Sequence, residues 1–144
     1  MALTVSIQQY ELPSEGVQAA VLADVVDLGI QETKFGKKDK VRFVYLLEEK
    51  DSKGEPKRAF QTFTKSLNEK AQLRKTLAQL GAKFDGKAID LETYVGAQVS
   101  LVLGFEDGTD GKKYARIISI MKPRAGQAVE VPEEFVRAKD RVNS

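Results

Sequence analysis

The spacing of apolar residues changes twice along this chain of 144 residues, and that change limits the folds it can adopt. Three segments that alternate apolar and polar residues come first, one segment with apolar residues three or four positions apart follows, and two further alternating segments end the pattern. A period of two is typical of β-strands, whereas steps of three and four place side chains on one face of an α-helix. The predicted strands span 17–28, 41–49, 58–64, 98–105 and 113–121.

The single helical segment, predicted at 67–80, carries signals at both of its ends. Ser66 lies three residues before Glu69, which is the spacing of a capping box. Gly81 stands where a left-handed residue would end the helix. The apolar face of this helix is expected to hold Leu73, Leu77, Leu80 and Phe84.

Three strands, one helix and two strands follow one another in the order of the OB-fold. That fold is a five-stranded, partly open Greek-key barrel. Five short strands bury more apolar surface when they curl around a core capped by a helix than when they lie flat. We therefore predict an all-β fold with one helix, namely an OB-fold with the helix between strands 3 and 4. A split β-sandwich with one helix and an unrelated α+β domain are the alternatives.

The same pattern divides the chain into three parts. Residues 1–15 are predicted to be an N-terminal extension, residues 16–123 the OB-fold domain, and residues 124–144 a C-terminal tail. In the tail Pro132 precedes two acidic residues, and cations follow towards the end. Proline and acids at the start with cations at the end favour a short helix in the tail.

Two absences from the composition narrow the range of functions. The chain has no cysteine and no histidine, which removes disulfides, thiol nucleophiles, the usual zinc sites and the commonest general base. The pair Asp24 and Asp27 has no partner base or nucleophile, and Asp107 and Asp110 lie among glycines that suit a tight turn. We therefore expect no enzyme activity, no cofactor and no metal site.

Charge is distributed unevenly along the chain. Residues 31–75 hold 13 Lys and Arg against 7 Asp and Glu, a balance of +6, and the other residues hold 10 against 14, or −4. These sum to the net charge of +2. A local basic field on an acidic body indicates an anionic partner, although a solvated lysine-rich surface would have the same composition.

Four segments together carry a resemblance to known proteins: "GVQAAVLADVVDLGIQETKFGKKDKVRFVYLLEE", "GEPKRAFQTFTKSLNEKAQLRKTLAQLGAKF", "DLETYVGAQVSLVL" and "DGKKYARIISIMKP". Together they resemble a group of small OB-fold proteins of phages and prophages that is regarded as single-stranded-DNA-binding-like. The most particular element is "FTKSLNEKAQLRKTL", where the third strand runs into the capped helix. The chain departs from bacterial single-stranded-DNA-binding proteins, since it has no tryptophan and no acidic tip containing phenylalanine. The resemblance implies phage-type replication or recombination.

In OB-folds that bind nucleic acid, the ligand crosses strands two and three between the loops that join strands one and two and strands four and five. Cations that follow phosphates, interleaved with aromatic rings on which bases stack, are typical of sequence-tolerant single-strand binding. Phe43, Tyr45 and Phe63 lie among apolar neighbours and are expected in the core. The candidate nucleic-acid-binding residues are Lys34, Phe35, Lys37, Lys38, Lys40, Arg42, Lys57, Arg58, Phe60, Lys65, Lys112, Lys113 and Tyr114.

The sequence thus predicts a non-enzymatic protein that binds single-stranded DNA with little sequence preference. RNA as the ligand stays open, and so does a protein-interaction or assembly module in which the lysines serve solubility. A homodimer or higher homo-oligomer is compatible with either reading. No run of 18 apolar residues and no signal peptide is visible, so we expect no membrane span and a cytoplasmic location.

Overall fold

The computed structural model describes residues 12–34, 36–65, 72–82, 89–124, 126–132, 135 and 137. Its elements are β1 (Gly16–Thr33), β2 (Gly36–Lys50), β3 (Pro56–Thr64), α1 (Gln72–Gln79), the 3-10 helix η1 (Leu91–Tyr94), β4 (Gln98–Asp107) and β5 (Lys113–Met121). The five strands and the helix between the third and fourth follow the predicted order. None of the helices in this part of the chain is long and apolar enough to cross a membrane.

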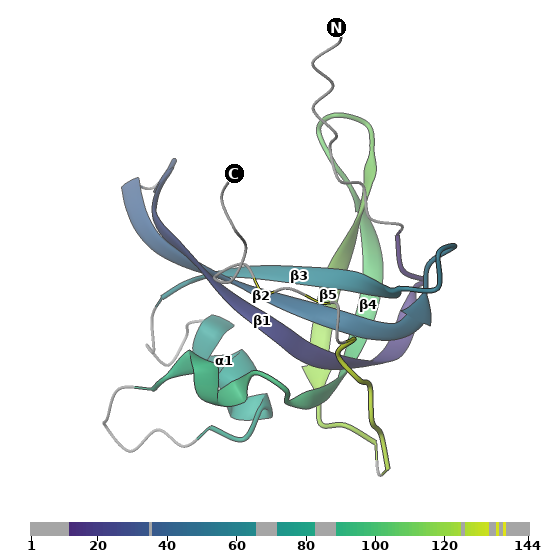
Figure 1. Cartoon of the computed structure of the whole chain (residues 1–144). Coiled ribbons are helices and arrows are strands. Elements are labelled where there is room, and N and C mark those ends of the chain that lie inside the picture. Colours follow the sequence, from purple (N-terminus) through teal and green to yellow (C-terminus); the bar gives the residue numbers. More distant parts are fainter. Residues whose placement is uncertain are drawn as a thin grey trace, which may run out of the picture.

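The strands form one antiparallel sheet in the order β3-β2-β1-β4-β5 (Figure 1). The central strand β1 pairs with β4 over its first residues and with β2 over most of its length. Two register shifts interrupt its pairing with β2, one between Leu22 and Asp24 and one between Asp27 and Gly29. Irregularities of this kind bend and twist a strand. The sheet therefore curls along its longest strand.

The curled sheet brings its two edge strands towards each other without joining them. Cα atoms of β3 and β5 come within 8 Å of one another, yet no ladder pairs these strands among the described residues. The helix α1 approaches both edges and places Leu73 and Leu77 in the core. The all-β prediction with one helix is confirmed, and the sheet stays open along the seam between β3 and β5.

One face of the sheet carries the main apolar core. Phe43 and Tyr45 of β2 and Phe63 of β3 are buried there, as predicted. The ring of Phe43 meets that of Phe63 edge to face, with 5.0 Å between their centroids. Aromatic pairs of this geometry stabilise a core beyond the area that they bury. The opposite face of β2 and β3 is thus left for other contacts.

Several predicted boundaries differ from the structure. The predicted strands 17–28 and 41–49 leave the basic segment "QETKFGKKDK" as the loop between strands one and two. This prediction is wrong, since β1 continues to Thr33 and β2 begins at Gly36. The 3-10 helix η1, begun by Asp90 whose side chain accepts the Glu92 N–H at 3.0 Å, was not predicted. The short helix predicted in the tail falls mostly on residues that the structure does not describe and stays a prediction. Gly81 has the positive φ expected of a helix end, +93°.

The remaining helix predictions fall on residues that the structure does not describe. Ser66, Glu69 and Phe84 lie outside the described residues, as does the candidate ligand residue Phe35. The capping box and the start of the helix at 67 therefore stay predictions.

Candidate nucleic-acid interface

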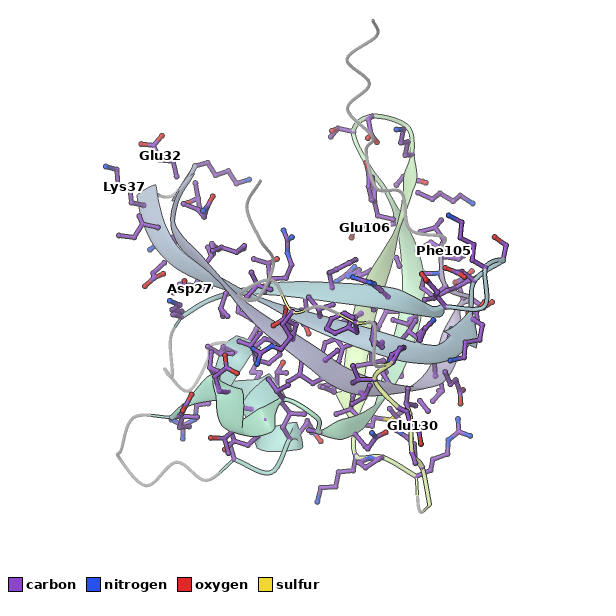
Figure 2. The ribbon with its side chains drawn as sticks, in the orientation of Figure 1. Asp27, Glu32, Lys37, Phe105, Glu106 and Glu130 are labelled. Atoms are coloured by element: carbon purple, nitrogen blue, oxygen red, sulfur yellow. The ribbon has the colours of Figure 1, made fainter. Side chains whose placement is uncertain are left out.

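The first two strands extend beyond the core as a two-stranded ribbon. Glu32 pairs with Lys37 near its free end, and Figure 2 shows both residues there. The turn is held by the Thr33 hydroxyl, which donates to the carbonyl oxygen of Gly36 at 2.7 Å. Lys34 is exposed at the tip. The basic segment is therefore a hairpin arm rather than a loop.

Where β2 meets β3, directly opposed residues share a face of the sheet. Since Val41, Phe43 and Tyr45 face the core, the residues between them face away from it. From the ribbon inward, the rows on this outward face are Lys40 beside Thr64, Arg42 beside Thr62, Val44 beside Phe60 and Leu46 beside Arg58. Candidate residues from two separate strands therefore lie together.

Three cations follow one another along the outward face of β2. Lys38, Lys40 and Arg42 are two residues apart, which corresponds to about 7 Å per step in a strand. We call these three residues the basic stripe. Lys40 Nζ donates to the Thr64 hydroxyl at 3.0 Å, and Arg42 Nε lies 3.5 Å from the Thr62 hydroxyl.

Within the part of the chain that the structure describes, the charges of the basic stripe are not neutralised by carboxylates. None of the three takes part in an ion pair with another described residue. The hydroxyls of Thr62 and Thr64 orient the side chains of Arg42 and Lys40 without cancelling their charge. The stripe therefore presents positive charge that can follow an anionic backbone.

An aromatic ring stands at the inner end of the basic stripe. Phe60 occupies the row after Arg42, beside Val44, and 39% of its surface is exposed. A half-exposed ring on a sheet is the surface on which a nucleobase stacks. Cations and a stacking surface therefore adjoin on one face of β2 and β3.

Lys57 has a structural role instead. Its Nζ lies 2.8 Å from the Glu49 carboxylate and donates to the carbonyl oxygen of Leu12 at 2.9 Å, and only 13% of the side chain is exposed. Alternation along β3 places it on the side opposite Arg58. The ion pair joins β3 to β2 and to the segment before β1.

Lys65 is likewise engaged by carboxylates. Its Nζ lies 2.8 Å from Asp27 and 3.2 Å from Asp39, at the base of the ribbon. The hydrogen bond from Lys65, with a second from the Gly29 N–H, lowers the pKa of Asp27. The same hydrogen bond raises the pKa of Lys65. This cluster fixes where the ribbon leaves the body of the sheet.

The remaining candidates lie on the other hairpin, which stands apart from the ribbon in Figure 1. Lys112 and Lys113 are exposed. The Tyr114 hydroxyl donates to the Asp110 carboxylate, and this hydrogen bond raises the pKa of Tyr114. A Cβ atom on Gly108 would clash with the Tyr114 ring. Tyr114 therefore packs over its own turn.

The structure thus brings together Lys38, Lys40, Arg42, Arg58 and Phe60. It does not place Lys37, Lys57, Lys65, Lys112, Lys113 or Tyr114 beside them.

Two aromatic residues were missed in the sequence analysis, one on the hairpin of β4 and β5 and one in the tail. Phe105 of β4, which Figure 2 shows on the second hairpin, has Lys113 Nζ 6.0 Å from its ring centroid. Phe135 of the tail lies against Arg58, with 5.2 Å from the guanidinium carbon to the ring centroid. Phe105 is the last residue of the predicted strand 98–105, directly before the second hairpin, which was a usable signal. Phe135 lies in a segment with no periodic pattern.

Within the described ranges no cluster of three or more Asp and Glu side chains is arranged to hold a metal ion. No protein-family model matches the chain, and a search of curated proteins finds no match either.

Proposed function

We propose that this chain is a non-enzymatic OB-fold protein that binds single-stranded DNA with little sequence preference. The observation that carries the proposal is the basic stripe of Lys38, Lys40 and Arg42, which ends at the half-exposed ring of Phe60. Phosphates would follow the cations and a base would stack on the ring. The resemblance to phage and prophage proteins adds replication or recombination as the setting.

The sheet order supports the OB-fold part of the proposal. Strand β1 pairs with both β2 and β4, the edges β3 and β5 approach each other, and α1 packs beside both edges. This is the arrangement expected of a partly open barrel with a helix between strands 3 and 4. In such a barrel the outward face of β2 and β3 is the ligand face.

The proposal is tested by fluorescence anisotropy at ~50 mM salt, where phosphate contacts are strongest. The probes are labelled oligonucleotides of about 20 nucleotides, longer than one OB-fold's site, as single-stranded DNA, duplex DNA and single-stranded RNA. We expect single-stranded DNA to bind more tightly than duplex. Equal binding of RNA would widen the ligand class, and no binding of either single strand would refute the proposal.

Reversing two charges of the basic stripe tests whether the nucleic acid binds there. Lys38→Glu with Arg42→Glu should abolish binding at the same salt concentration. The matched control reverses two exposed lysines elsewhere, Lys53 and Lys122, and changes the net charge equally. Equal losses in both double variants would mean that only overall charge matters.

A second candidate function is an assembly module, favoured by exposed apolar residues on the edge strand β5. Ile118 and Met121 are both exposed there. An edge strand with apolar side chains is a surface on which another chain can pair. Under this proposal Ile118→Lys would abolish self-association in analytical ultracentrifugation, whereas reversal of the basic stripe would not.

A further inference from the structure

The described residues 126–132, 135 and 137 of the tail, which we call the strap, lie across the outward face of the sheet. Gln127 Nε2 donates to the carbonyl oxygen of Val99 at 2.7 Å. Val129 and Gln98 exchange two hydrogen bonds of 2.9 Å each. These contacts begin on β4, and further strap contacts are made to β1, β2 and β3. The strap therefore crosses the sheet on the side that carries the basic stripe.

Apolar side chains hold the strap to the middle of this face. Val129 and Phe135 pack against Val21, Ala23 and Leu46, which form a cluster separate from the main core. Burial of these side chains is the hydrophobic contribution that keeps the strap in place. The strap thus covers apolar sheet surface that would otherwise face water.

Arg137 fixes the far end of the described strap. Its Nε lies 2.8 Å from the Asp24 carboxylate, and its guanidinium also reaches Glu92 of η1 at 2.7 Å. Asp24 is 2% exposed. Because Asp24 lies on the outward face that the strap crosses, lifting the strap would open this carboxylate to water, which lowers the cost of separating the pair.

The strap ends beside the proposed ligand site. Arg58, on which Phe135 rests, lies two residues from Phe60 on the same face of β3, a distance of about 7 Å. A single strand that stacks on Phe60 and continues along this face reaches Arg58 next. While its guanidinium rests on Phe135, that face of the arginine is covered and cannot stack on a base.

The strap also makes a contact that resembles one made by a bound single strand. An aromatic ring lies against an arginine, as a nucleobase does in single-strand sites. In sequence, Glu130, Glu133 and Glu134 precede this ring, so that 126–137 carries three acids against one arginine. Figure 2 shows Glu130 on the strap. Such a segment would repel phosphates while it occupies a base position.

We propose that the strap competes with single-stranded nucleic acid for the Arg58 end of the outward face, and that binding of a strand lifts it. This inference rests on the proposed function. It extends the ligand site by one row, from Val44 and Phe60 to Leu46 and Arg58. The nucleic acid can contact this added row only when the strap has moved away from it.

The test compares the wild type with variants that loosen the strap, using labelled oligo-dT of about 6 and about 20 nucleotides, lengths within and beyond the site of one OB-fold. Phe135→Ala should bind both strands about 3- to 10-fold more tightly, because Arg58 lies only about 7 Å beyond Phe60 and a strand of either length that stacks on Phe60 reaches it. Gln98→Ala, which removes both hydrogen bonds to Val129 from a position outside the stripe, should act in the same direction. Val131→Ala is the matched control, since Val131 is an exposed strap residue.

A second measurement does not depend on the folding of any variant. Hydrogen–deuterium exchange of the wild type should become faster at the Val129 amide when the longer oligo-dT is saturating. Unchanged or slower exchange, or affinity that is equal or weaker in Phe135→Ala and Gln98→Ala, would overturn the competition. If neither the wild type nor the variants bind oligo-dT at ~50 mM salt, the proposed function itself fails and the competition fails with it.

Discussion

Replacing Glu49 with Gln tests how the sheet is fastened at the end away from the ribbon. The Glu49 carboxylate accepts hydrogen bonds from Lys57 Nζ at 2.8 Å, the Ser14 N–H at 2.8 Å and Gln18 Nε2 at 2.7 Å. It therefore joins the segment before β1, strand β1 itself and strand β3. The amide of Gln keeps the shape but not the charge, and leaves the partly buried Lys57 without its counter-ion.

The expected loss of stability in Glu49→Gln follows from the pKa of the Glu49 carboxyl. Partial burial opposes ionisation of Glu49, but the hydrogen bonds from Lys57, Ser14 and Gln18 outweigh it and lower the pKa from 4.5 to about 2. A shift of this size corresponds to at most about 3–4 kcal/mol of stability at neutral pH, and to about 2 kcal/mol once the solvent around the exposed quarter of the side chain is allowed for. Because the folded pKa is the lower one, this stabilisation is present above pH 4.5 and is lost as the pH falls towards 2.

Urea denaturation at pH 7 and pH 3 measures both quantities. We expect Glu49→Gln to lower the free energy of unfolding by about 2 kcal/mol at pH 7. The difference from the wild type should shrink to less than half of that at pH 3, because most of the stabilisation by the carboxylate is then gone. Equal stabilities at pH 7, or a difference that is the same at both pH values, would refute the role given to Glu49.

Three further predictions concern single residues of the interface and its surroundings. Lys57→Met should leave the affinity for oligo-dT unchanged in anisotropy titrations while lowering the urea midpoint; a clear loss of affinity would return Lys57 to the ligand site. Phe60→Ala should weaken binding by about 1–3 kcal/mol, roughly 5- to 150-fold, and an unchanged affinity would remove the stacking role. Gly36→Ala should cost about 1–2 kcal/mol in urea denaturation because Gly36 has a φ of +102°, and a neutral result would show that the ribbon turn can relax.

The sequence predicted the parts of the fold that depend on burial. Alternating apolar residues located all five strands, and the core positions of Phe43, Tyr45 and Phe63 follow from their apolar neighbours along each strand. The ribbon was missed because residues 31–40 are mostly charged and carry no apolar alternation. These residues form strands because their backbones pair with each other, not because one face of the ribbon is buried in the core.

The candidate site was predictable only in part, for a related reason. The spacing of Lys38, Lys40 and Arg42 was visible in the sequence. It places them on one face of a sheet only because β2 begins at Gly36, so that all three lie in a strand. Ion pairs such as that of Lys57 with Glu49 depend on how distant segments meet, and no local pattern records them. The contact of Phe135 with Arg58 joins residues 77 positions apart, from 135 − 58, in a segment without periodicity.

The most direct test of the central proposal is the salt dependence of oligo-dT binding. Each phosphate contact adds about 0.7 to the slope of log Kd against log salt concentration for a single strand. Replacing Lys38 and Arg42 with Gln should therefore lower the slope by about 1.4, whereas the same change at the exposed Lys53 and Lys122 should leave it unaltered. A slope that is equal in the wild type and in the Lys38→Gln, Arg42→Gln variant would contradict the proposal that the basic stripe holds the backbone of the nucleic acid.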